Sequence, residues 1–183
     1  MKLIQFFTFT ASISLTCFPA WAGDVVGRVL SPVKESVVWL EGVNKPLNSA
    51  AKTVSQHNRT FSPSFMVVTV GQTINMLNDD TIAHNVFSQS PAKIFNLGIY
   101  PKGQSKAVKF DKTGVIDLRC TIHSNMRGVV VVVPNTFFSQ PIANGSFSIK
   151  NVPPGKYILK YWSAKGQKQK NIVVGSGQTK VDF

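Results

Sequence analysis

The sequence predicts an all-β fold. Short runs rich in Val, Ile and Phe recur along the chain, and Gly, Pro, Asn or Asp stands between most of them. No stretch after residue 22 carries the 3.6-residue period of a long amphipathic helix. Strands at such regular spacing are typical of β-sandwiches and β-barrels.

The expected strands follow one another along the chain. They are residues 24–30, 36–40, 64–70, 72–77, 81–88, 106–110, 115–120, 128–133 and 157–162. Segment 91–103 has no clear strand pattern, and we expect a short helix or an irregular stretch there. Asn144-Gly145 is a hairpin turn signal within 139–150, and Pro153-Pro154-Gly155 predicts a further turn.

Residues 1–22 have the pattern of a secretory signal peptide. Lys2 precedes a mostly apolar stretch, and Ala20-Trp21-Ala22 offers small residues at a cleavage site after Ala22. The apolar stretch is short of the roughly 20 residues that span a bilayer, although an uncleaved anchor is the alternative. We therefore expect a periplasmic protein with no stable membrane insertion after cleavage.

Cleavage would remove Cys17 and leave Cys120 as the only cysteine. The exported protein could then form no internal disulfide. A lone thiol in an oxidising compartment needs protection by burial or by a bound metal.

The chain carries 20 Lys and Arg against 8 Asp and Glu, a formal net charge of +12. The basic residues are densest in segments 102–112 and 156–170. No nucleic-acid motif accompanies them, so we expect an acidic redox protein as partner, with charge speeding the encounter. An anionic envelope surface is a further candidate, and a merely solvated basic surface is the alternative.

One loop combines three metal-binding side chains. Cys120, His123 and Met126 follow each other at intervals of three residues, so a short loop can gather them around one point. Soft sulfur ligands together with imidazole select copper. Taken singly, Cys120 could be a buried structural thiol and His123 a surface residue, and Met126 could simply pack in the core. The Val-rich runs on both sides argue against a helical face.

A second histidine must come from elsewhere in the chain, and His84 is the best candidate. It lies where a polar turn enters a strand, although it could also be a core histidine at a strand edge. The next residue, Asn85, could hydrogen-bond to the loop around Cys120 and fix the ligand positions. We expect His57, which has no partner nearby in sequence, to lie on the surface.

These motifs resemble the cupredoxins. The His84-Asn85-Val86 step and the 120–126 loop look like plastocyanins and, in loop length, most like amicyanin. The stretch 53–134 also resembles the exported bacterial proteins labelled methylamine-utilisation-like. Its matching motifs are Phe61-Ser62-Pro63, Ser90-Pro91-Ala92-Lys93, Leu97-Gly98-Ile99-Tyr100 and Phe110-Asp111-Lys112-Thr113-Gly114-Val115.

The resemblance implies a Greek-key β-sandwich with one type 1 copper ion. His84, Cys120 and His123 would be its equatorial ligands and Met126 its axial ligand. Ser124 stands where these proteins commonly have Pro, which bears on loop rigidity and reduction potential rather than on ligation. A binuclear copper site would need two cysteines on the loop.

The flanks resemble a different family. Residues 23–29 and 36–40 look like the opening strands of a carboxypeptidase-regulatory-like, or transthyretin-like, domain, and residues 144–157 look like its closing half. We therefore predict a signal peptide (1–22), a small β-sandwich (23–50 and 135–183) and a cupredoxin domain (51–134) inserted in it. The alternative is a plain extension of the copper domain at either end.

The expected function is transfer of single electrons between redox partners. A copper carrier or sensor with the same ligands is the first alternative. A thiol enzyme using Cys120 and His123 is a weaker one, because no oxyanion-hole motif accompanies them. The few, unpaired carboxylates make an acid-base hydrolase improbable, so we expect no enzyme activity.

Overall fold

A computed structural model describes residues 22–30, 34–43 and 50–183. The predicted signal peptide therefore lies, apart from Ala22, outside the described residues. All regular structure among the described residues is β-strand, as the sequence predicts. A helix long and apolar enough to cross a membrane is not found among them.

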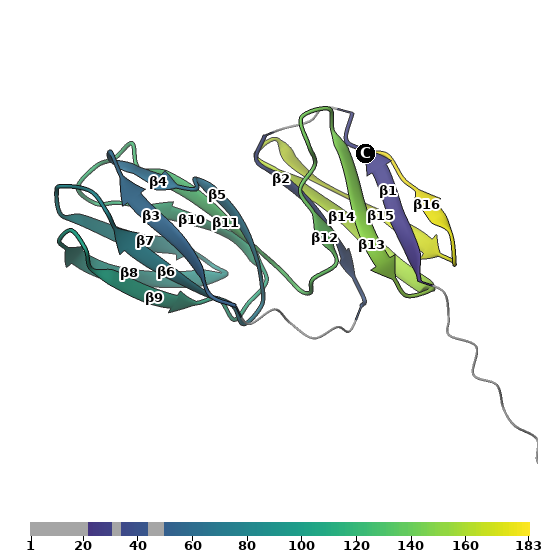
Figure 1. The fold of residues 1–183 in the computed structure, drawn as a ribbon, viewed down its shortest axis with the longest axis horizontal. Helices are drawn as coiled ribbons and strands as arrows, with labels where there is room; N and C mark the ends of the chain where they lie inside the picture. The colour runs from purple at the N-terminus through teal and green to yellow at the C-terminus, as the bar shows by residue number, and fades with distance from the viewer. Residues whose placement is uncertain (1–21, 31–33, 44–49) are drawn as a thin grey trace, which may run out of the picture.

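Residues 51–134, here called the inserted domain, form a two-sheet Greek-key sandwich (Figure 1). The five-stranded sheet has the order β5-β11-β10-β7-β8, and the four-stranded sheet has the order β4-β3-β6-β9. The chain crosses repeatedly from one sheet to the other. The strands are β3 (Lys52–His57), β4 (Thr60–Ser62), β5 (Phe65–Thr69), β6 (Thr73–Asn78), β7 (His84–Ser90), β8 (Lys93–Tyr100), β9 (Ser105–Lys109), β10 (Gly114–Arg119) and β11 (Arg127–Val133).

The core of the inserted domain lies between these two sheets. Alternation along each strand turns one set of apolar side chains inward, as the alternating burial along β6 illustrates. The fully buried members include Ile74, Met76, Phe110 and Ile116, and the same cluster contains Cys120 and Met126.

The two flanks of the inserted domain pair with each other and form the flanking domain. Strand β1 (Gly23–Arg28) pairs with β13 (Ser146–Val152), and β2 (Ser36–Glu41) pairs with β14 (Gly155–Ser163). The resulting sheets have the orders β13-β1-β16 and β12-β2-β14-β15. The remaining strands are β12 (Phe138–Ser139), β15 (Gly166–Val174) and β16 (Gln178–Lys180).

The flanking domain has a core of its own, which draws side chains from both flanks. Val25 and Leu40 come from the N-terminal flank, and Phe147, Leu159 and Phe183 come from the C-terminal flank. Gly27 lies where β1 approaches the end of the chain so closely that a Cβ would collide with the backbone of Val181.

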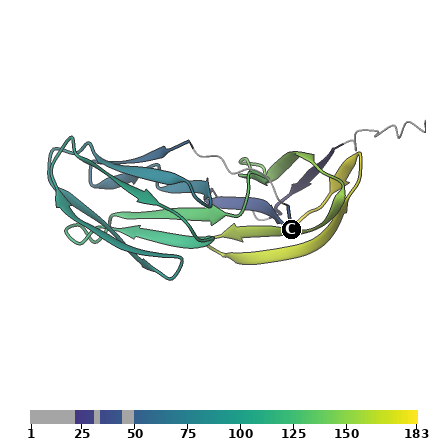
Figure 2. The ribbon, with the colours of Figure 1, turned by 90° about the horizontal axis from the view of Figure 1, so that it is seen from below.

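The two domains lie end to end along the long axis of the molecule (Figure 2). A third apolar cluster joins them and contains Val37 and Trp162 from the flanking domain with Val67, Val131 and Val133 from the inserted domain. Within it the rings of Phe65 and Trp162 stack nearly parallel, with centroids 5.9 Å apart. The junction is therefore a packed interface rather than a bare linker.

The structure differs from the sequence-based expectation in several places. Strands β3, β4, β15 and β16 were not expected, and two further segments depart from their predicted form. The expected helix or irregular stretch at 91–103 is wrong in its larger part, because β8 occupies most of it and pairs with β7. The turn at Asn144-Gly145 forms, but the strands β12 and β13 on either side of it belong to different sheets. The turn signal was therefore correct, whereas the hairpin it suggested does not form.

Candidate metal centre

The structure brings the predicted ligands together at one end of the inserted domain. His84 opens β7, Cys120 follows the last residue of β10, and His123 and Met126 lie in the short loop before β11. This end is remote from the flanking domain, which packs near Gly114 at the opposite end of β10. At about 3.4 Å per residue, β10 separates the two ends by roughly 17 Å.

Three donor atoms cluster at this end. One ligand atom each from His84, Cys120 and His123 lie within 4.8 Å of one another. The Nδ1 atoms of the two histidines are 3.2 Å apart, and their rings meet edge-on with centroids 4.9 Å apart. His84 and Cys120 are buried, and His123 is half-buried.

A β-bulge lies beside His84, on the partner strand. Asn85 pairs with Ile99 and Phe87 pairs with Asn96, so β8 carries the extra residue between them. His84, Asn85 and Val86 are all buried, and this end of β7 is therefore covered on both faces. Bulges of this kind are frequent next to functional sites.

Asp80 fixes the ring of His84. Its Oδ2 lies 2.9 Å from Nε2 of His84 and also accepts the backbone N–H of Arg59, at 2.8 Å. The hydrogen bonds from Arg59 and His84 hold the pKa of Asp80 well below its usual range, so the carboxylate is ionised and acts as an acceptor. His84 then carries its proton on Nε2, which leaves Nδ1 free to bind a metal.

A second polar residue holds the turn that carries Asp80. The side-chain oxygen of Asn78 accepts the N–H of Asp80, and its amide donates to the carbonyls of Ile82 and Tyr100. This is the local turn chemistry for which Asn is favoured. The turn and strand β8 are thereby tied together behind His84.

Asn85 links the two parts of the site, as the sequence suggested. Its Oδ1 accepts the backbone N–H of Thr121 at 3.3 Å, directly after Cys120. Its amide donates to Asn96 and to the carbonyl of Gly98. The donor in the bond to the loop is the backbone of Thr121, and Asn85 accepts.

Met126 lies at the base of the loop. Its N–H donates to the carbonyl of His123 at 3.0 Å and closes a turn, and its side chain is 1% exposed. It shares the apolar cluster of Cys120. His57, in contrast, is exposed beside Asp79, as expected.

Asp80 and Asn78 were not predicted from the sequence. Both lie in the polar turn 78–81, and Asp80 stands four residues before the histidine it orients. An acidic residue at that offset from a candidate ligand is the signal that could have revealed it.

The residues present fit a copper ion. One thiolate and two imidazole nitrogens are the equatorial donor set that copper favours, and Met126 is buried in the same cluster as Cys120. Asp80 gives His84 the tautomer that such a site requires.

Comparison with known proteins agrees with this chemistry. Residues 49–133 match the family model described as copper binding proteins of the plastocyanin/azurin family. No curated protein matches the chain.

Similar solved structures each cover about half of the chain. A purple cupredoxin from Nitrosopumilus maritimus is 24% identical, with 45% of this chain and 99% of that chain covered and a TM-score of 0.41. An amicyanin variant in its oxidised state is 29% identical, with 45% and 82% covered and a TM-score of 0.42. A copper-containing nitrite reductase from Thermus scotoductus SA-01 is 23% identical over 52% of this chain and 25% of its own, with a TM-score of 0.44.

The family match spans the inserted domain with all four predicted ligands, and the structure gathers three of them around one point. Residues 49–133 therefore form a cupredoxin domain, which matches the plastocyanin/azurin family of copper-binding proteins.

Proposed function

We propose that this protein transfers single electrons between redox partners in the periplasm, through one type 1 copper ion. His84, Cys120 and His123 would be the equatorial ligands and Met126 the axial ligand. The observation that carries the proposal is the assembly of three donor atoms within 4.8 Å on a rigid β scaffold.

Preassembly of the ligands suits electron transfer. Asp80 holds His84, and Asn85 holds the backbone after Cys120, both through contacts that involve no metal. Copper supplies the redox chemistry by alternating between its cuprous and cupric states. Ligands that are already held in place need little rearrangement between those states, and this keeps the barrier low.

Electrons would pass through His123. His84 is fully buried, whereas His123 is half-buried and lies in the surface loop. The exposed apolar side chains Ile82 (36%) and Ile122 (45%) lie on the segments that carry the two histidines. An apolar rim around an exposed ligand edge would let a partner approach closely and exclude water.

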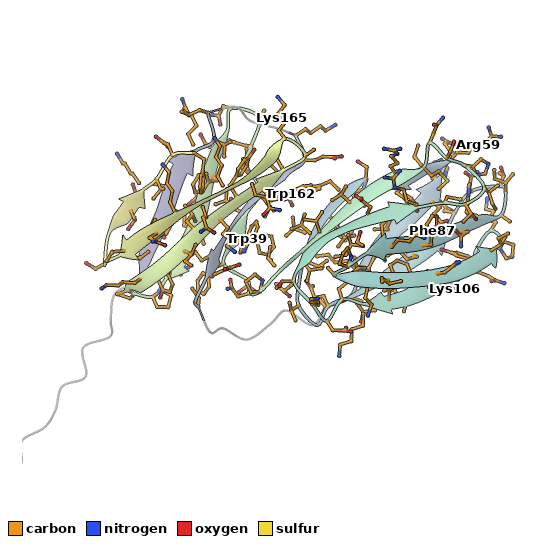
Figure 3. All side chains as sticks on the ribbon, turned by 180° about the vertical axis from the view of Figure 1, so that it is seen from behind. Trp39, Arg59, Phe87, Lys106, Trp162 and Lys165 are labelled. Atoms are coloured by element: carbon orange, nitrogen blue, oxygen red, sulfur yellow. The ribbon has the colours of Figure 1, made fainter. Side chains whose placement is uncertain are left out.

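The partner is expected to be acidic. The inserted domain carries basic side chains such as Lys106 and Arg59, which are both labelled in Figure 3. A positive surface steers a negatively charged protein, and this effect weakens as salt screens the charges. Association rates that fall with ionic strength would support this assignment, and rates independent of salt would contradict it.

Titration with cupric ion tests the ligands. The protein should develop the strong visible absorption of thiolate-to-copper charge transfer at one ion per chain. Cys120→Ser should abolish this band. His57→Ala, a histidine change outside the site, should leave it unaltered. A Cys120→Ser protein that remains blue would overturn the assignment.

The axial role of Met126 needs its own test. Met126→Leu conserves size and burial but removes the sulfur, so the band should persist while the reduction potential rises, because an electron-donating ligand is lost. An unchanged potential would make Met126 a packing residue only.

The electron self-exchange rate separates an electron carrier from a copper carrier. Mixed cuprous and cupric protein should exchange electrons rapidly, measured by NMR line broadening, while each chain retains its ion. Transfer of copper to added apoprotein on the same timescale, or very slow self-exchange, would favour the copper carrier instead.

A further inference from the structure

A groove lies at the junction of the two domains, on the side of the inserted domain away from the metal centre. Its volume is about 200 Å³, and both domains line it. The flanking domain contributes Trp39, Glu41, Lys160, Trp162 and Gln167, and the inserted domain contributes Thr113, Gly114, Val115, Val131 and Val132. Clefts between domains are preferred sites for small ligands.

The floor of the groove is the outer face of the sheet β12-β2-β14-β15. Trp39 on β2 lies opposite Lys160 on β14 and Phe138 on β12, so these three side chains share one face. Trp162 lies nearer the inserted domain (Figure 3), where Phe65 stacks on it. The floor therefore offers an aromatic surface bordered by polar side chains.

One polar atom of this floor lacks a partner. The indole Nε1 of Trp39 is shielded from solvent and donates to no acceptor among the described residues. Because this nitrogen is covered, a molecule in the groove would contact the exposed part of the Trp39 side chain rather than Nε1.

Further hydrogen-bonding capacity surrounds Trp39. Gln167 and Gln169 are exposed, and within the described part of the chain their side chains have no hydrogen-bond partner. A second hollow of about 230 Å³ adjoins the groove and shares Trp39, Lys160 and Gln167 with it. Each amide can both donate and accept.

The charges of the groove cancel. Lys160 and Glu41 form an ion pair at 2.9 Å, so an anionic ligand would meet the carboxylate and a cationic ligand would meet the ammonium. The chemistry of the lining favours an uncharged molecule with one apolar face for the indole and hydroxyl groups for the amides.

We propose that this groove binds a neutral saccharide. A sugar ring has apolar C–H faces that pack on an aromatic ring, and its hydroxyls both donate and accept hydrogen bonds. The volume of the groove equals that of about seven water molecules at ~30 Å³ each, which is enough for a single sugar ring. The adjoining hollow provides space for a second ring. Because the metal centre lies at the other end of the inserted domain, a bound saccharide leaves it accessible.

The indole N–H signals of Trp39 and Trp162 provide the test. The chain from Gly23 onward, which contains both domains and only these two tryptophans, is labelled with ¹⁵N and titrated with glucose, N-acetylglucosamine, maltose and cellobiose. At least one sugar should shift the Trp39 Nε1–H signal saturably in the millimolar range or below. Gln167→Ala should weaken that binding at least fivefold.

Gln178→Ala, on β16 and outside the groove, is the matched control and should bind normally. Both glutamines are exposed, so neither change threatens the fold. The proposal fails if no sugar moves the Trp39 signal, or if Gln167→Ala binds as well as the control. Copper binding is measured on the same samples, so that failure of the groove to bind sugar is distinguished from failure of the metal centre to bind copper.

Discussion

The carboxylate of Asp80 lies 2.9 Å from Nε2 of His84, and both side chains are buried. The same carboxylate accepts the backbone N–H groups of Arg59 and Thr81. It therefore connects the β3–β4 turn to the candidate metal ligand. The orientation of His84 depends on this network as well as on the strand that carries it.

Asp80→Asn should weaken copper binding without removing the blue colour. The amide is uncharged and can present an N–H to His84, so Nε2 protonation is no longer enforced. Loss of such a supporting carboxylate typically lowers metal affinity 10- to 100-fold. Competition with a copper chelator measures the affinity, and the visible spectrum at saturating copper shows that the ligands remain.

Asp79→Asn is the matched control for this change. Asp79 is the preceding residue, is largely exposed and lies near His57 rather than His84. Its replacement should leave copper affinity unaltered. Equal losses in both variants would mean that general electrostatics, and not the bond to His84, governs the affinity.

Asn85→Ala should loosen the loop that carries the thiolate. The change removes the acceptor of the Thr121 N–H and the donor to Asn96 and Gly98. Buried groups left without partners cost about 1–3 kcal/mol each, so the variant should be less stable. Copper release, followed by loss of the charge-transfer band in chelator, should become faster.

Asn96→Ala provides the comparison. It removes one partner of the Asn85 amide but leaves the bond to Thr121 intact. Stability should fall in both variants, whereas faster copper release should be confined to Asn85→Ala. The reverse pattern would place the support of the loop elsewhere.

Much of this site could be read from the sequence, because its ligands are rare residue types at fixed offsets. Cys120, His123 and Met126 lie on one loop, and His84 was the best remaining donor. Asp80 offers a weaker signal, its position four residues before a candidate histidine ligand. A carboxylate in a polar turn usually faces solvent, and the folded turn shows that this one faces a buried ring.

Tyr100→Phe should destabilise the protein by about 1–3 kcal/mol. The hydroxyl of Tyr100 is buried, accepts from the amide of Gln56 at 2.6 Å and donates to the carbonyl of Met76 at 3.0 Å. Phenylalanine fills the same space but makes neither hydrogen bond. Denaturant unfolding at neutral pH measures the difference.

Ionisation of Tyr100 should also lower the free energy of unfolding at alkaline pH. Burial raises its pKa to about 12 from an ordinary value of 10.0. The folded state then binds the proton more tightly than the unfolded state, so this stabilisation is complete below the ordinary pKa and is lost as pH rises through the raised one. Tyr100→Phe should flatten the fall in stability over that interval. An equally steep fall in the variant would exclude Tyr100 as its source.

The strands of the fold could be predicted where apolar and polar residues alternate along the sequence. The flanks were read correctly as strand-forming, since runs such as that of β2 are rich in Val and bounded by turn residues. Strand β8 was not predicted because its sequence does not alternate clearly: the exposed positions include Ile94 and Ile99, and the strand contains Asn96 and Gly98. Strand β8 lies at the edge of its sheet, where outward side chains need not be of a particular type. Its pairing with β7 stabilises it.

Trp162→Ala should uncouple the two domains. The indole is 9% exposed, stacks on Phe65 at 5.9 Å and belongs to the cluster that joins the domains. Truncating a buried Trp typically costs about 3–5 kcal/mol, and here the loss falls on the junction as well as on the flanking domain. Calorimetry should show one cooperative transition in the parent protein and two separated transitions in the variant, the flanking domain unfolding first. Val173→Ala, an exposed change in the same domain, should retain the single transition. A single transition in Trp162→Ala would show that this side chain does not hold the domains together.

The blue absorption band of Trp162→Ala should be unaltered at room temperature, because β10 separates the junction from the ligands. A shifted band would show that the junction is coupled to the metal centre.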